Sequence, residues 1–135
     1  MLIEETFAHT DTDGTFRCFS IPRLRELLRL HPDDWQLIDV PINRPQARFI
    51  KETRGLDEDR IRSYPMAKLD EPGIICLFAD TSQLIVDGNH RLVKRVQRGL
   101  RRMLFWQAPE KIWKQALVDA SRYADVRTLQ RLVPD

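Results

Sequence analysis

The residues best suited to chemistry gather in one short turn, Asp87-Gly-Asn-His-Arg91, between an apolar run and an amphipathic basic segment. Gly88 permits a sharp strand-to-helix turn, and Asn89 can cap the helix. The first turn of a helix has N–H groups without intrahelical acceptors at the positive end of the dipole, so it forms an anion site. His90 and Arg91 add positive charge there, which costs stability unless an anion binds. We therefore expect a phosphate site, with Arg91 on phosphate oxygens and His90 donating a hydrogen bond or transferring a proton.

A structural interpretation of the same turn stays open, in which Asp87 pairs with Arg91 and His90 only packs. The segment that follows is basic and contains no acidic residue; its cations are Arg91, Lys94, Arg95, Arg98, Arg101 and Arg102. Such a helix could lie along a nucleic-acid backbone. A solvated face is the alternative, because a net charge of only +2 means that acidic residues elsewhere balance it.

The bulk composition is that of an ordinary soluble chain. Its 135 residues suit one domain, and 42% hydrophobic with 31% charged residues excludes a disordered composition. The first ten residues have two glutamates and no basic stretch, unlike a secretory signal, and no apolar run is long enough to span a membrane. Cys18 and Cys76 lie in apolar, strand-like surroundings, which favours two buried free thiols and a cytoplasmic protein.

The pattern of apolar and polar residues predicts an α+β fold: a single compact domain with a mixed β-sheet flanked by helices. Strands are expected at residues 2–9, 15–19, 35–42, 73–78, 83–86 and 101–106. Helices are expected at residues 21–30, 46–53, 57–64, 89–98 and 109–133. An Asp-Gly turn predicts a hairpin of the first two strands, and Gly99 ends the helix that begins at Asn89. The polar segment 43–72 is either a lid that faces a ligand or a surface loop.

The central motif resembles the core of the ParB/sulfiredoxin-like superfamily. A strand ends in Asp-Gly-X-His-Arg at residues 84–92, then come an apolar helix, Gly99 and the strand RRMLFW. Upstream, Val40-Pro-Ile-Asn-Arg-Pro45 resembles the family's early strand and arginine–proline turn, followed by short helices and an apolar strand that pairs with the motif strand. The resemblance covers about residues 36–107. It implies one ParB/sulfiredoxin-like domain over residues 1–135, with an N-terminal hairpin and a C-terminal helical extension.

The family implies a nucleotide pocket. Its members include CTP-dependent partition proteins, an ATP-using sulfinic acid reductase, a free-serine kinase and proteins of DNA modification systems and phages. By this resemblance the helix after the turn holds the phosphates of ATP or CTP with Mg²⁺. The implied phosphate contacts are Gly88, Asn89, His90 and Arg91, with Arg44 as a further candidate. Asp87 would fix the turn or approach the metal, and no separate metal site is expected in the protein.

Two departures narrow the implied activity. Sulfiredoxins have a catalytic cysteine where this chain has Asn89, which argues against sulfinic acid reduction. Partition proteins have paired arginines in the turn and a separate helix-turn-helix domain, for which we expect too few residues here. If the protein is a phosphotransferase or NTPase, His90 and Arg91 would be the catalytic residues that stabilise the transferring phosphoryl group. Glu52, Asp57, Glu58 and Asp70 all stay open as the carboxylate base.

Three functions thus remain from the sequence. The first is a nucleotide-binding protein, with or without phosphoryl transfer. The second is a non-catalytic DNA-binding or regulatory module that uses the basic face of residues 91–102. The third is an accessory or inhibitory protein, such as one encoded by a phage, that uses the fold only as a scaffold. A homodimer is compatible with each of them, and a membrane partner with none.

Overall fold

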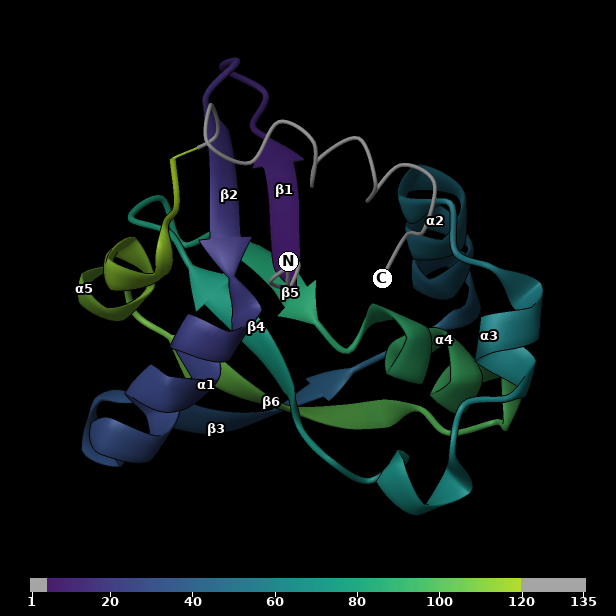
Figure 1. Cartoon of the computed structure of the whole chain (residues 1–135). Helices are drawn as coiled ribbons and strands as arrows, with labels where there is room; N and C mark the ends of the chain where they lie inside the picture. The colour runs from purple at the N-terminus through teal and green to yellow at the C-terminus, as the bar shows by residue number, and fades with distance from the viewer. Residues whose placement is uncertain (1–4, 120–135) are drawn as a thin grey trace, which may run out of the picture.

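A four-stranded mixed sheet lies at the centre of the computed structural model, which describes residues 5–119 (Figure 1). The strands are β1 Thr6–Thr10, β2 Phe16–Ser20, β3 Gln36–Pro41, β4 Gly73–Leu77, β5 Gln83–Asp87 and β6 Arg102–Ala108. The α-helices are α1 Ile21–Leu30, α2 Arg44–Arg54, α3 Glu58–Arg62, α4 Asn89–Gln97 and α5 Glu110–Trp113. Short 3-10 helices occupy Pro32–Asp34, Met66–Lys68 and Lys114–Ala116. The expected α+β class with a mixed sheet is confirmed.

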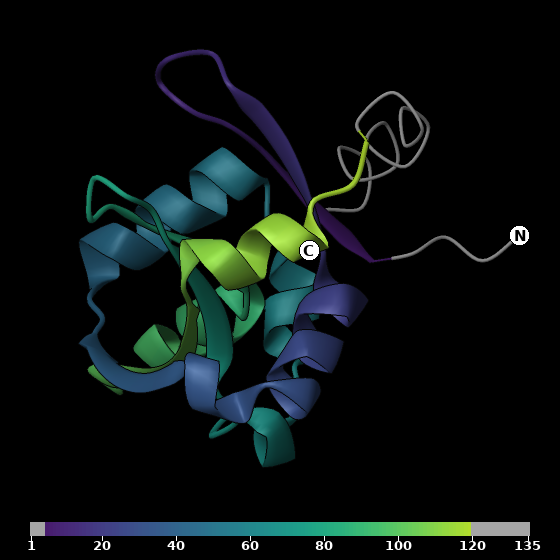
Figure 2. The same cartoon turned by 90° about the vertical axis from the view of Figure 1, so that its left-hand side faces the viewer.

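The central sheet has the strand order β3-β6-β4-β5. β3 pairs antiparallel with β6, β6 parallel with β4, and β4 antiparallel with β5. The apolar strand β4 therefore lies beside β5, the strand that leads into the turn, as expected from the sequence. β1 and β2 form a separate antiparallel hairpin, whose tip projects beyond the helices in Figure 2.

The sheet is buried on both faces. Successive residues of its strands β4 and β5 pack alternately into two different apolar clusters. Ile74 and Cys76 on β4 and Val86 on β5 belong to one apolar cluster, which includes residues of the hairpin, α1 and α5. Ile75 on β4 belongs to a second cluster, with Ile85 packed against it, which includes residues of α2, α3 and α4. Adjacent residues of a strand point to opposite faces of a sheet. The turn after β5 thus emerges between two packed layers, with α1 and α5 on one side and α2 and α3 on the other (Figure 1).

The expected long C-terminal helix is wrong at residues 117–119. Helical geometry covers Glu110–Trp113 and Lys114–Ala116, after which Leu117 pairs with Phe19 and the Val118 N–H donates to Cys18 O at 2.9 Å. The free side of β2 offers backbone partners to Leu117 and Val118, and this pairing overrides the helical spacing of their apolar residues. Residues 120–133 of the expected helix lie outside the described residues.

Other boundaries shift by a few residues for local reasons. α2 begins at Arg44 rather than at residue 46, because the Asn43 side chain accepts a hydrogen bond from Gln46 N at 2.8 Å and caps the helix. α3 begins after Asp57, whose side chain caps it through Asp59 N. The first strand begins at Thr6, and the earlier part of the expected strand is outside the described residues apart from Glu5.

The edge strand β3 is protected against pairing with another chain. Ile42 N donates to Arg101 O at 2.9 Å, so by antiparallel alternation residues 37, 39 and 41 direct their backbone groups to the open edge. Pro41 has no N–H, and Arg102 covers the Asp39 carbonyl with a hydrogen bond at 3.1 Å. Such features are common on edges that stay unpaired. They give no support to a homodimer formed through β3.

Two simpler expectations can be compared with the structure. Both cysteines are buried free thiols, and burial raises the pKa of Cys76 to about 12, so this thiol stays neutral at neutral pH. Within residues 5–119, none of the helices has the length and apolar character needed to cross a bilayer.

Candidate functional site

The turn between β5 and α4 is built on Gly88. Gly88 is in the left-handed region, with φ 99° and ψ 14°, and it occupies the N-cap position of α4. The expectation that Asn89 caps the helix is wrong, because Asn89 is already helical and its side chain is buried. A glycine cap has no side chain to accept hydrogen bonds from the first turn. The start of α4 therefore keeps the anion-binding character expected of it.

A second glycine allows this turn to pack against the sheet. A Cβ on Gly88 would lie 3.0 Å from Met103 Cε and 3.2 Å from Gly73 Cα. A Cβ on Gly73 would lie 2.6 Å from the Asp87 carbonyl oxygen. Gly73 is the first residue of β4 and lies directly beside the turn. The sequence predicted it only as the start of a strand, although a glycine at the start of an apolar strand can indicate a close approach of another backbone.

The three polar residues that open α4 are almost entirely inside the protein. Asn89 is 2% exposed, and His90 and Arg91 are 7% exposed each. Burial of polar side chains is costly unless they are hydrogen-bonded, and histidine and arginine are rarely placed in the first turn of a helix for stability alone. The structure thus brings together His90, Arg91, Asn89 and Gly88, as the sequence expected, but in a buried turn.

Arg91 lies beside the turn and is held by the segment that precedes β4. Its Nε donates to Tyr64 Oη at 2.8 Å, and its Nη1 donates to Pro72 O at 3.0 Å. Its Nη2 is 3.8 Å from Glu71 Oε2, beyond hydrogen-bond distance. A Cβ on Gly88 would be 3.5 Å from Nη1, which shows how close the guanidinium is to the start of α4. The positive charge expected at the turn is therefore present. Two of the three guanidinium nitrogens of Arg91, however, already have acceptors within the protein.

Asp87 has a partner that the sequence did not indicate. Its Oδ2 is 3.1 Å from Nη2 of Arg25 on α1, and Nη1 of Arg25 is 3.2 Å from Glu5 Oε2. The pairing of Asp87 with Arg91, left open from the sequence, is wrong. Partial burial lowers the pKa of Arg25, but the carboxylates of Asp87 and Glu5 outweigh it and raise the pKa overall. Arg25 lies on the solvent side of the amphipathic helix α1, where the local sequence pattern does not indicate a contact with Asp87.

The basic face of residues 91–102 is only partly a solvated surface, because four of its six cations bind other parts of the protein. Lys94 donates to Arg62 O at 2.9 Å. Arg95 donates to Leu69 O and to Arg102 O, each at 2.9 Å. Arg102 pairs with Asp39, 3.0 Å away. Arg91, Lys94 and Arg95 together fasten residues 62–72 to α4, whereas Arg102 binds β3.

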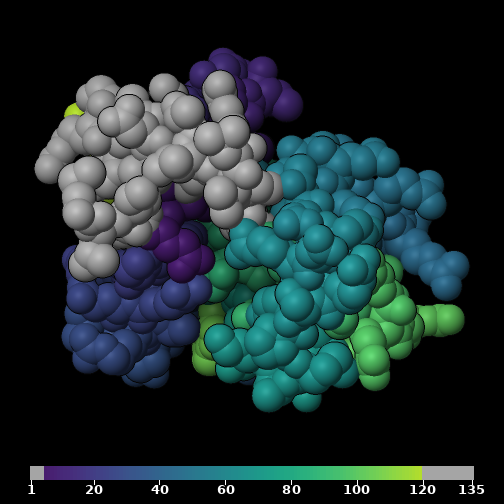
Figure 3. Space-filling model, turned by 45° about the vertical axis from the view of Figure 1, so that its right-hand side comes forward, coloured from purple at the N-terminus to yellow at the C-terminus, as the bar shows by residue number. Residues whose placement is uncertain are grey.

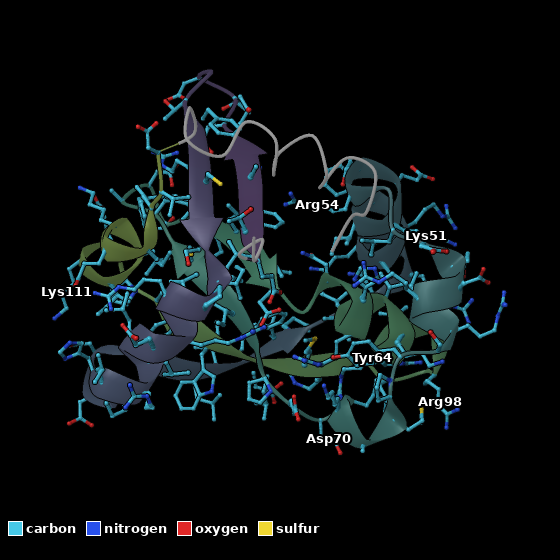
Figure 4. All side chains as sticks on the ribbon, in the orientation of Figure 1. Lys51, Arg54, Tyr64, Asp70, Arg98 and Lys111 are labelled. Atoms are coloured by element: carbon cyan, nitrogen blue, oxygen red, sulfur yellow. The ribbon has the colours of Figure 1, made fainter. Side chains whose placement is uncertain are left out.

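That fastened segment is the polar region for which the sequence left a lid or a surface loop open. It runs under α4, where Figure 4 shows Tyr64 and Asp70. We name residues 62–72 the strap. Most of its contacts with α4 are hydrogen bonds from buried or half-buried cations to backbone carbonyls, and hydrogen bonds to charged groups are stronger than neutral ones.

The carboxylates considered as a base are committed elsewhere or exposed. Asp57 caps α3, Glu58 pairs with Lys51, and Asp70 is 3.2 Å from Arg95. Glu52 is exposed on α2. Arg44 is exposed at the first position of α2, and no hydrogen bond or ion pair joins it to the turn within residues 5–119. The structure therefore does not bring Arg44 into this site.

A hollow opens in front of the turn. Figure 3 shows it between the purple and dark blue hairpin and α1 on one side and the teal residues around α3 on the other, with green β5 and α4 atoms at its floor. Arg54, at the end of α2, extends toward the hairpin above α4 in Figure 4, and its Cζ is 4.1 Å from the centre of the Phe7 ring. Burial and the nearby Arg54 charge lower the pKa of His9 on the hairpin. Arg54 therefore brings positive charge close to the hairpin.

Comparison with known proteins gives no relative from which a function for this site could be inferred. No family model matches the chain, and no curated protein or solved structure matches it significantly. The relationship with the ParB/sulfiredoxin-like superfamily stays a proposal that rests on the motif at residues 84–92 and on the order of elements around it. Function has to be argued from the turn, the strap and the charges around them.

The packing of Gly88 predicts a specific loss of stability. Gly88→Ala and Gly99→Ala each place alanine at a positive φ, which costs about 1 kcal/mol. Only Gly88→Ala also pushes a Cβ into Met103 and Gly73, because nothing lies within 4 Å of a Cβ on Gly99. We expect Gly88→Ala to lower the free energy of unfolding in urea by about 1–3 kcal/mol more than Gly99→Ala. Equal losses would contradict the close packing of the turn.

The strap predicts that two arginines of α4 differ in importance. Arg95→Ala leaves the Leu69 and Arg102 carbonyls without their donor, which should lower the free energy of unfolding by about 1–3 kcal/mol. Arg98→Ala, at an exposed position of the same helix, should change it by no more than about 0.5 kcal/mol. Urea unfolding gives both values, and amide exchange should quicken in the strap of the Arg95 variant alone. A similar effect of both substitutions would mean that α4 does not depend on the strap.

Proposed function

We propose that this protein binds a nucleoside triphosphate, ATP or CTP, with its phosphates at the start of α4. One observation carries the proposal: α4 begins with a glycine cap that supplies no side-chain acceptor, and a buried guanidinium lies beside that cap. A helix designed for stability alone would have an acidic residue there. Phosphate would accept from the first-turn N–H groups and balance the charge of Arg91.

The residues around the turn have distinct roles in this proposal. The backbone of Gly88, Asn89 and His90 cradles the phosphates, and the His90 side chain donates to them. Arg91 contributes its charge and its Nη2, since its other nitrogens hold Tyr64 and Pro72. Asp87, oriented by Arg25, fixes the turn. Arg54 contributes positive charge from the opposite wall of the hollow.

Mg²⁺ would enter this site with the nucleotide. Within residues 5–119, histidine, cysteine and acidic side chains do not gather in groups of three or more that could hold an ion. Mg²⁺ commonly keeps several waters and binds through phosphates and one or two carboxylates, and Asp87 is the carboxylate of the turn. The nucleotide phosphates would supply most of the ligands.

Binding has more support here than phosphoryl transfer. In a transfer reaction His90 and Arg91 would stabilise charge on the moving phosphoryl group. A transfer also needs a base, and the two carboxylates beside the turn, Asp87 and Glu71, face Arg25 and Arg91. A cytoplasmic location, where nucleotides are abundant and thiols stay reduced, fits the two free cysteines.

Calorimetric titration tests the proposal. ATP, CTP, GTP and UTP, each with Mg²⁺, are titrated into the wild type, into His90→Ala and into His31→Ala, which changes an exposed histidine at the end of α1. We expect micromolar binding of one nucleotide, at least tenfold weaker binding in His90→Ala, and unchanged binding in the control. Arg91→Ala is unsuitable alone, because it also releases the strap.

The free energy of unfolding, measured with and without nucleotide, is a second readout. It shows whether weaker binding by His90→Ala is a loss of the site or a loss of the fold. A ligand that binds only the folded state at 100 times its Kd raises the free energy of unfolding by about 2.7 kcal/mol. The wild type should show such a rise with the nucleotide that binds, and a folded His90→Ala protein should show less. Absence of binding by all four nucleotides in the wild type would overturn the proposal.

A further inference from the structure

Four arginines at one corner of the molecule have no counter-charge in the structure. They are exposed, and no carboxylate lies within ion-pair distance of them in the described part of the chain. We name them the arginine corner: Arg44, Arg48, Arg98 and Arg101. Arg98 and Arg101 are the two cations of the basic segment that bind neither the strap nor β3 within residues 5–119.

The four residues come together where α2 begins and α4 ends. Ile42 N donates to Arg101 O at 2.9 Å, which places Arg101 beside the residues that lead into α2. Arg44 and Arg48 are one turn apart on α2 and so share a face. Arg98 follows α4 directly, and Figure 4 shows it at the end of α4 farthest from the turn. At the right-hand edge of Figure 3, blue α2 and the green end of α4 adjoin.

The charge of the chain is distributed unevenly in favour of this corner. Residues 42–72 and 88–102 contain thirteen lysines and arginines and six acidic residues, although the whole chain has 22 and 20. Most of those acidic residues pair with other cations: Glu58 with Lys51, Asp59 with Arg62, Asp70 with Arg95 and Glu71 with Arg91. Glu52, one turn after Arg48 on α2, reduces the positive charge of the corner but does not cancel it.

We propose that the arginine corner binds the phosphate backbone of duplex DNA without reading its sequence. Guanidinium groups match phosphate oxygens in geometry, and uncompensated cations on one surface are the electrostatic signature of backbone binding. The corner combines the first half of α2 with the residues that follow α4, so we expect it to contact a backbone and to insert no element into a groove. Phe49, 66% exposed on α2 next to Arg48, adds apolar surface at its border.

This surface differs from the one expected from the sequence. The earlier hypothesis used the whole face of residues 91–102, of which Arg91, Lys94 and Arg95 hold the strap. The new surface keeps Arg98 and Arg101 and adds Arg44 and Arg48 from α2, which belong to a different part of the sequence. It is also separate from the turn at Gly88, so DNA and nucleotide binding can be tested independently.

Fluorescence anisotropy with a labelled duplex of unrelated sequence tests the proposal on the whole chain. Four phosphate contacts predict a slope of log K against log salt near −3.6, or about 150-fold weaker binding at 200 mM than at 50 mM salt. Arg48→Ala/Arg101→Ala should weaken binding and make the slope shallower by about 1.8. Arg29→Ala/Lys68→Ala, which removes the same charge from exposed positions outside the corner, should bind within twofold of the wild type.

Three results would overturn the proposal. They are no binding by the wild type at 50 mM salt, an equal loss in the Arg29/Lys68 control, and equal displacement of the duplex by polyglutamate at the same concentration of charge. The last result would mean that the corner attracts any acidic chain. His90→Ala should bind DNA as the wild type does, which separates this test from the nucleotide site.

Discussion

The guanidinium of Arg91 joins the parts of this structure that matter most for function. It lies against the Gly88 turn and donates to Tyr64 and Pro72, so the start of α4 and the end of the strap share one charge. The arrangement requires glycine at position 88, because a side chain there would meet Met103 and the backbone of Gly73. A positive charge at the positive end of a helix dipole is unfavourable by itself. Its acceptors on the strap offset part of that cost, and a bound phosphate would offset more.

The cations of α4 and of the residues that follow it have different roles, which depend on their position along the helix. Cations in the first two turns bind backbone carbonyls of the strap, whereas Arg98 and Arg101, which follow the helix, are exposed to solvent. The same basic segment therefore has two roles, and its amino-acid composition alone does not show which cations belong to which role. One part stabilises the connection between α3 and β4, and the other, with α2, forms the arginine corner.

Much of the fold could be predicted from the sequence, because strong local signals specify it. The apolar strand β4, the glycine stop at Gly99 and the hairpin of the first two strands are all where the patterns placed them. Contacts between distant segments could not be predicted. Arg25 reaches Asp87 across 62 positions, and Arg91 reaches Tyr64 across 27, with no spacing rule to connect them. Leu117 left its expected helix for the same reason, since the edge of β2 is a distant partner.

The sequence indicated that Gly88, Asn89, His90 and Arg91 lie together at the start of a helix, but it did not indicate their environment. The turn chemistry of Asp-Gly-Asn-His-Arg indicated an anion site at a helix start, and the structure has that helix start. The burial of Asn89 and His90, and the strap over Arg91, depend on packing that a single sequence does not reveal. Amide chemical shifts during a titration with Mg²⁺-ATP and Mg²⁺-CTP would test the central claim most directly. The account predicts that the largest shifts fall on Asn89, His90 and Arg91; largest shifts at the arginine corner, with the turn unmoved, would contradict it.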